Sequence, residues 1–163
     1  MSFVSKNEIE KFAFNDCVIV KRDVKEDRVS YTVEALIVKP DNTQNSNYTK
    51  SYAGTAVIDF IGGEELSGVK DGYRKYDAND NIIEEVSDTV LDDMTLESIV
   101  KNCGDMYLCG IDRIPEKDNE YVIFLEKQPE VEFDTCPSDS YQIKIKCDEI
   151  IVTWDKYLNR VED

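Results

Sequence analysis

Carboxylates are the most abundant groups in this chain that could do chemistry. The 163 residues include 35 Asp and Glu, 19 Lys and Arg, and no histidine. Adjacent acids at residues 64–65, 84–85 and 92–93 could supply the two carboxyl groups that glycoside hydrolysis uses. So many acids also produce such pairs without any catalytic cause, and no spacing singles out a partly buried acid. A carboxylate-dependent hydrolase is therefore kept as an alternative.

The missing histidine removes several chemistries from consideration. Ser-His-Asp and Cys-His catalysis and every His-containing zinc site are excluded. The cysteines form no C-x-x-C pair, and their odd number does not complete a disulfide framework; they are Cys17, Cys103, Cys109, Cys136 and Cys147. We expect buried apolar thiols in a reducing compartment, although Lys101 could favour a thiolate at Cys103. We predict no cofactor, no metal site and no catalytic residue.

The run from Asp77 to Asn81 has oxygen-bearing side chains at alternate positions, as calcium loops do. Ile82 stands where an EF-hand requires Gly, and Asp88 stands where it requires Glu. Asp and Asn also tolerate the positive φ angles of tight turns. We therefore interpret the run as a hairpin turn.

Negative charge is concentrated in one part of the sequence. Residues 1–75 carry a net charge of −1, residues 76–100 carry eight acids and no base, and residues 101–163 carry −7. Half of the total charge of −16 thus lies in 25 residues. This charge disfavours binding to nucleic acids and to anionic membranes, and it complements a basic protein. A solvated face that serves solubility remains the other interpretation.

We predict that the partner-binding surface is built around this segment. Its acids would supply attraction and register, while two tyrosines would act as packed anchors. We call this set the predicted acidic surface: Tyr73, Tyr76, Asp77, Asp80, Glu84, Glu85, Asp88, Asp92 and Asp93.

The elements that must position these residues are short strands. Residues 28–39 alternate apolar and polar side chains, and with residues 16–23 they predict a hairpin. Residues 55–60 predict a third strand. Residues 72–76 and 81–86 flank the Asp and Asn run and predict a second hairpin, which would carry much of the predicted acidic surface.

The rest of the chain predicts one helix and more strands. The helix is expected over residues 88–103, with Ser87 or Asp88 as its N-cap. Further strands are expected at residues 106–114, 121–126, 131–135, 141–147 and 149–154, and a short helix or frayed end at 156–163. The sequence therefore predicts a single domain over residues 1–163 that is mainly β or α+β. Its core would be an antiparallel sheet or sandwich of eight to ten short strands, with one or two short helices.

Three segments of this small acidic chain give it a family likeness: Phe14 to Ile19, the strand Val29 to Val38, and Cys147 to Asp155. In a β-rich plan without a catalytic set, they resemble the immunity proteins of polymorphic toxin and contact-dependent inhibition systems. The likeness concerns the general plan of the whole chain, and it assigns no functional residue. It implies a tight one-to-one complex with a toxin domain, often a basic nuclease, whose active site the acidic surface blocks.

The leading hypothesis is thus a non-enzymatic, acidic protein that binds and neutralises a basic protein, and that is monomeric without it. The opening residues lack the cationic start and apolar run of a signal peptide, so we expect a cytoplasmic location. Two alternatives stay open. A hydrolase would need a concave pocket holding two carboxyl groups, one of them desolvated. A self-assembling structural domain would show an exposed unpaired strand edge or a large apolar patch.

Overall fold

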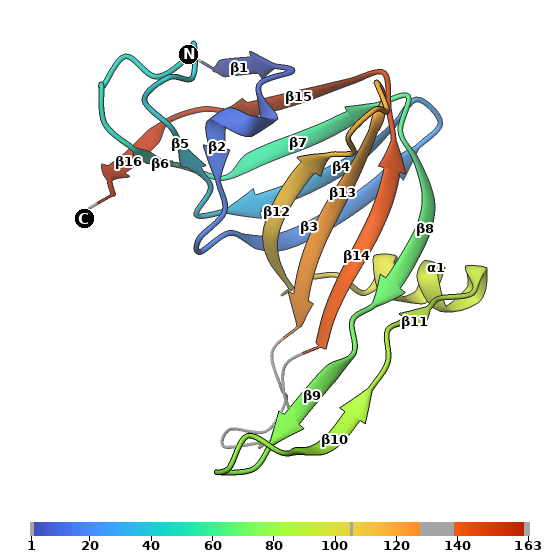
Figure 1. The fold of residues 1–163 in the computed structure, drawn as a ribbon. Coiled ribbons are helices and arrows are strands. Elements are labelled where there is room, and N and C mark those ends of the chain that lie inside the picture. The colour runs from blue at the N-terminus through green and yellow to red at the C-terminus, as the bar shows by residue number, and fades with distance from the viewer. Residues whose placement is uncertain (1, 105, 128–138, 162–163) are drawn as a thin grey trace.

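The structure is a computed structural model that describes residues 2–104, 106–127 and 139–161. It confirms a mainly antiparallel β fold with few helices (Figure 1). The described residues contain sixteen strands, more than the eight to ten expected, because several strands are only two to four residues long. They also contain one α-helix, α1 (Asp93–Lys101), and one 3-10 helix, η1 (Ile9–Lys11). No helix in this part of the chain is long and apolar enough to cross a membrane.

Ten of the strands form one curved antiparallel sheet. In spatial order these are β1 (Phe3–Lys6), β15 (Glu149–Trp154), β7 (Ala56–Ile61), β4 (Arg28–Glu34), β3 (Val18–Lys25), β12 (Tyr107–Arg113), β13 (Glu120–Lys127), β14 (Asp139–Lys146), β8 (Glu64–Lys70) and β11 (Thr89–Val90). A four-stranded sheet adds β16 (Tyr157–Arg160), β6 (Ser51–Ala53), β5 (Ile37–Val38) and β2 (Phe12–Ala13). The last two strands form a separate hairpin, β9 (Tyr73–Tyr76) and β10 (Ile82–Val86).

One core cluster joins the large sheet, the four-stranded sheet and helix α1. Buried and more exposed residues alternate along β7 and β14, as the sequence pattern of those segments predicts, and they also alternate along β15. Trp154, Tyr31 and Phe60 are the largest fully buried side chains. The sheet curves enough to bring Arg22 of β3 against Glu65 of β8, although three strands separate β3 from β8 in the sheet.

Three predicted elements are wrong in detail. The strand expected over residues 28–39 breaks at Ala35, whose φ of +61° sends the chain out of the large sheet and into β5. The helix begins at Asp93 and not near Asp88, because Thr89 and Val90 pair with β8. Residues 157–160 form strand β16 and not a helix, because they pair with β6. The strand expected at 131–135 lies outside the described residues.

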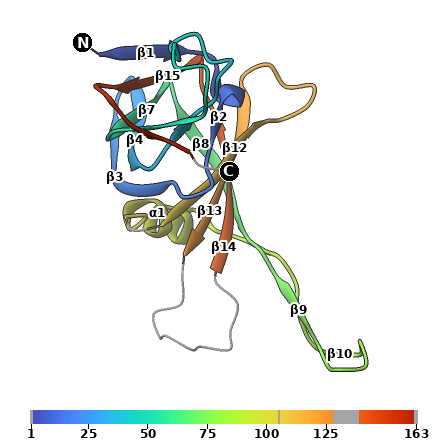
Figure 2. The same ribbon diagram turned by 90° about the vertical axis from the view of Figure 1, so that its left-hand side faces the viewer.

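The hairpin of β9 and β10 projects from the rest of the molecule. It extends beyond the end of β8, and a view turned by 90° shows the same projection (Figure 2). Its position follows from the connections, since β9 continues from β8 and β10 leads into β11, the last strand of the large sheet. We call residues 72–88 the hairpin arm.

Candidate functional site

The hairpin arm carries most of the predicted acidic surface. Seven of its nine members lie on the arm; they are Tyr73, Tyr76, Asp77, Asp80, Glu84, Glu85 and Asp88. The other two, Asp92 and Asp93, lie at the start of α1 on the body of the protein. The structure therefore brings most of the set onto one projecting element.

Asp77 and Asp80 build the turn at the tip of the arm. One Asp77 carboxylate oxygen accepts hydrogen bonds from the backbone N–H groups of Asn79 and Asn81, at 2.8 and 3.0 Å. These backbone hydrogen bonds hold the pKa of Asp77 below its usual value. Asp80 adopts a φ of +62°, as the turn interpretation of the sequence requires. Asp77 thus organises the turn.

The two glutamates of the arm are paired with cations of the neighbouring strand. Lys75 Nζ lies 3.3 Å from Glu84 Oε2, and the Tyr73 hydroxyl donates to Glu84 Oε1 at 3.1 Å. Arg74 Nε donates to Glu85 Oε1 at 3.1 Å. A segment without bases in the sequence therefore lies beside two bases in space. The arm still carries five acids against two bases.

At the base of the arm, the two strands approach closely. The backbone N–H of Gly72 donates to the carboxylate of Asp88 at 2.7 Å. A Cβ on Gly72 would collide with the carbonyl oxygen of Val86 and would lie 2.6 Å from the carbonyl carbon of Ser87. Glycine is therefore required here, and Asp88 fixes where the arm leaves the body.

Asp92 and Asp93 belong to helix α1. Asp92 is the N-cap, and its carboxylate accepts a hydrogen bond from the backbone N–H of Thr95 at 2.7 Å. This hydrogen bond holds the pKa of Asp92 below its usual value. Asp93 lies in the first turn, where a negative side chain complements the helix dipole. Asp92 therefore has the N-cap role that the sequence predicted for Ser87 or Asp88, and Asp93 stabilises the same end of the helix.

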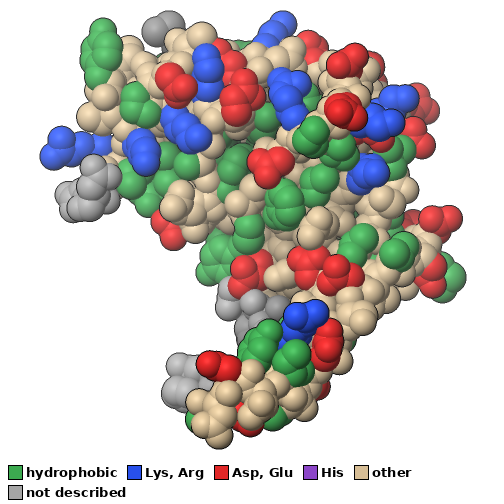
Figure 3. Space-filling model, in the orientation of Figure 1, with side chains coloured by type: hydrophobic (Ala, Val, Ile, Leu, Met, Phe, Trp, Pro, Cys, Tyr) green, Lys and Arg blue, Asp and Glu red, His purple; other side chains and the backbone are tan. Residues whose placement is uncertain are grey.

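The arm also exposes apolar side chains, and of these only Tyr76 belongs to the predicted acidic surface. Tyr76 is 53% exposed, Ile82 is 49% exposed and Ile83 is 64% exposed. Ile82 pairs directly with Tyr76, and the irregular register after Ile82 places Ile83 next to them at the tip end of β10. Figure 3 shows hydrophobic side chains on the arm beside acidic and basic ones. We call Tyr76, Ile82 and Ile83 the apolar tip.

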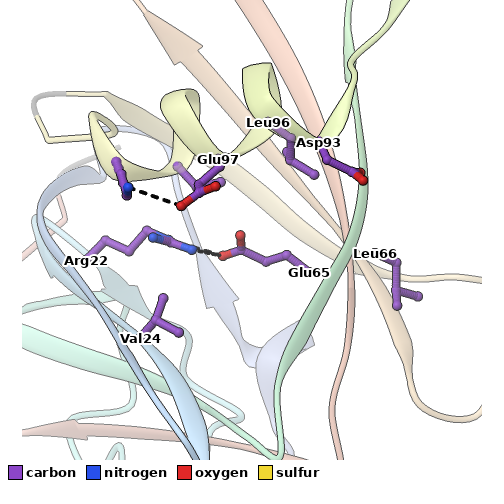
Figure 4. A pocket seen from close by; sticks show the side chains of 9 residues that line it. Arg22, Val24, Glu65, Leu66, Asp93, Leu96 and Glu97 are labelled. Carbon is purple, nitrogen blue, oxygen red and sulfur yellow. Dashed lines mark hydrogen bonds and ion pairs between the residues drawn. The ribbon is translucent and has the colours of Figure 1, made fainter.

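A pocket of about 450 Å³ lies between α1, β3 and β8 (Figure 4). Arg22 and Glu65 meet there, with Nη2 and Oε1 2.7 Å apart and with side chains only 11% and 10% exposed. Burial alone would lower the pKa of Arg22, but the hydrogen bonds and the charge of Glu65 raise it. Asp93 and Glu97 also line the pocket. The hydrolase alternative therefore has a concave site with a desolvated carboxylate, but that carboxylate is bound to a guanidinium.

The cysteines show no activated thiol among the described residues. Cys17, Cys103 and Cys147 are buried, and Cys109 is exposed. Burial raises the pKa of Cys103 to about 11, and Lys101 pairs with Glu97 instead of supporting a thiolate. Cys136 lies outside the described residues.

We searched the described residues for a metal site and compared the whole chain with known proteins. Among the described residues, no three His, Cys, Asp or Glu side chains lie close enough together to hold a metal ion. Comparison with known proteins finds no matching family model, no matching curated protein and no matching solved structure.

Proposed function

We propose that this chain is a non-enzymatic binding protein that docks a basic protein partner through the hairpin arm, as an immunity protein docks its toxin. The observation that supports this most is the apolar tip: three large apolar side chains, each about half exposed or more, on an arm with an excess of acids. Apolar anchors surrounded by charge are the arrangement that binding hot spots favour.

The apolar tip and the acids would have different tasks. Exposed ion pairs contribute little affinity, whereas buried aromatic and aliphatic side chains supply most of it. The acids of the arm would accelerate the encounter with a cationic partner, and salt would weaken this effect. Tyr76, Ile82 and Ile83 would then become buried and slow dissociation.

The arm is also suited to reach into a partner. Its projection places the apolar tip beyond the end of β8, so a partner can approach it from several sides (Figures 1 and 2). An immunity protein that inserted such an arm into a concave active site would block it sterically while its acids paired with the cations that bind substrate.

The test is capture of the partner by the intact protein from its source cells, followed by measurement with the purified partner. We expect the captured partner to be a basic protein that forms a one-to-one complex with this chain. The partner should be toxic when it is produced alone, and co-production of this chain should remove that toxicity. Ile83→Ser should weaken binding by about ten-fold or more, since truncating a hot spot costs that much. Leu158→Ser is the matched control, because Leu158 is 58% exposed on β16 of the body.

Two results would refute the proposal. The first is a partner whose affinity is the same for Ile83→Ser, Leu158→Ser and the unaltered protein. The second is a partner that is not basic and whose association rate does not change with salt.

A further inference from the structure

The outer edge of the hairpin arm has no neighbouring strand in the described part of the chain. There, β10 pairs with β9 alone, and β11 pairs with β8 alone. Residues 78–90 are all exposed, and this stretch includes the whole of β10 and β11. A strand edge of this kind presents backbone N–H and C=O groups that can pair with another chain.

Two common protections of a strand edge, proline and lysine, are missing here, whereas β10 and β11 are short and β10 carries Glu84 and Glu85. Residues 82–90 contain no proline and no lysine, the residues that commonly block such edges. The single register irregularity of the arm lies between Ile82 and Glu84, next to the tip, and the pairing from Glu84 to Val86 is regular. Val86 and Val90 are 40% and 77% exposed. The edge is thus both accessible and partly apolar.

The charges on this edge disfavour a second copy of the chain as its occupant. Antiparallel pairing of two copies about Glu84 or Glu85 would place a glutamate directly opposite a glutamate, which destabilises a sheet. Each copy also carries a net charge of −16. A strand with basic residues at the same two positions would instead form favourable cross-strand pairs.

We propose that the outer edge of β10 binds an extended basic segment of the partner as an added β-strand. This inference rests on the proposed function and specifies how the arm would recognise its partner. The segment would have two adjacent Lys or Arg residues opposite Glu84 and Glu85, flanked by apolar residues beside Ile83 and Val86. The pattern apolar-basic-basic-apolar reads the same in both directions, so it fits parallel and antiparallel pairing alike. Backbone hydrogen bonds would give affinity, and the side-chain pattern would give specificity.

The probe is a synthetic peptide with a Val-Lys-Lys-Val centre and three threonines on each side, added to the full-length protein. We expect it to bind, and we expect it to protect the backbone amides of residues 82–90 from hydrogen exchange. A peptide with a Val-Glu-Glu-Val centre should bind at least about ten-fold more weakly, because like charges would then oppose each other. The double variant Glu84→Lys, Glu85→Lys should reverse this preference. Its matched control changes the exposed Asp41 and Asp118, on loops outside the arm, to lysine.

A second peptide separates strand addition from simple charge attraction. It keeps the Val-Lys-Lys-Val centre but is N-methylated at alternate residues, which removes backbone donors and blocks close pairing while it retains the charge. Strand addition predicts that N-methylation at the residues that face β10 abolishes binding and amide protection. Equal binding of the methylated and unmethylated peptides would overturn the inference and leave the proposed function intact. Concentration-dependent dimers that protect residues 82–90 without any peptide would also overturn it, in favour of self-association.

Discussion

The ion pair between Arg22 and Glu65 predicts a large loss of stability when one partner is removed. Arg22 donates to one Glu65 oxygen through both Nε and Nη2, at 3.1 and 2.7 Å, and the Tyr31 hydroxyl donates to the same oxygen at 3.3 Å. These contacts connect β3 and β4 to β8, although three other strands lie between β3 and β8 in the sheet. The ion pair therefore links strands that are not neighbours in the sheet, at the pocket that α1 also lines.

The magnitude follows from the burial of the two side chains. Breaking a buried ion pair costs about 3–5 kcal/mol, because the remaining charge stays desolvated. The pocket beside the pair admits water, so we expect Glu65→Gln to cost about 3 kcal/mol, at the lower end of that range. For a chain of this length, that corresponds to a fall in Tm of about 6–12 °C. Replacing both residues with methionine should cost less than Glu65→Gln, about 1–2 kcal/mol, because an apolar pair leaves no unpaired charge but removes the acceptor of the buried Tyr31 hydroxyl.

Urea unfolding of the unaltered protein, Arg22→Met, Glu65→Met and the double methionine variant gives the coupling free energy directly, and Glu65→Gln is measured beside them. Asp23→Asn is the control, because Asp23 and Lys21 form an ion pair whose side chains are 46% and 66% exposed; it should cost less than about 1 kcal/mol. This account of the pair would be refuted if Glu65→Gln lowered the free energy of unfolding by less than about 1 kcal/mol. It would also be refuted if the double methionine variant were no more stable than the less stable single methionine variant.

Three further measurements test other parts of the structure. Gly72→Ala should displace the base of the arm, because the new Cβ would collide with the carbonyl oxygen of Val86. Partner binding should fall while the Tm changes little, and unchanged binding would contradict the role of this contact. The pKa of Asp92 is lowered in the folded protein, so its contribution to stability is present above its unfolded pKa of about 4 and is lost as the pH falls through the lowered folded pKa. The asparagine in Asp92→Asn still caps the helix but does not titrate, so circular dichroism should show less loss of helical signal on acidification in this variant than in the unaltered protein. Identical losses in the two proteins would contradict this role of Asp92. Alkylation at pH 8 followed by peptide mapping should label the exposed Cys109 well before Cys17, because burial raises the pKa of Cys17 to about 12. The two cysteines should react at equal rates only after the protein is unfolded.

Alternation of apolar and polar residues predicted the strands that have one buried face. It located β7, β14 and most of β4, because burial on one side of a sheet imposes a period of two. It could not predict the break at Ala35, since a positive φ at alanine has no local sequence pattern. It also missed β8, most of whose residues are partly or fully exposed, and where Gly68 leaves room for Leu96 of α1.

Counting charge along the sequence identified a segment without bases but not the charges that surround it in space. The segment without bases begins at Tyr76, directly after Arg74 and Lys75, and the hairpin turn folds it back onto those two residues. The pairing of β9 with β10 therefore places two cations beside the glutamates, and a count of charge along the sequence does not include the opposite strand. Tyr76 of the apolar tip was predicted as an anchor, but Ile82 and Ile83 were missed because isoleucine is also a typical residue of a buried strand.

The apolar residues of the arm have no clear use in folding, and this supports a binding role for them. No residue between Tyr73 and Val86 belongs to the buried core cluster of the described chain. A two-stranded hairpin alone in water is marginally stable, and an exposed Ile83 or Val86 loses its apolar contribution to stability. Polar β-formers such as threonine would maintain such a hairpin without the risk of aggregation. The proposed partner, covering the apolar tip and the open edge of β10, would account both for the isoleucines and for the glutamates, which would limit pairing to basic strands.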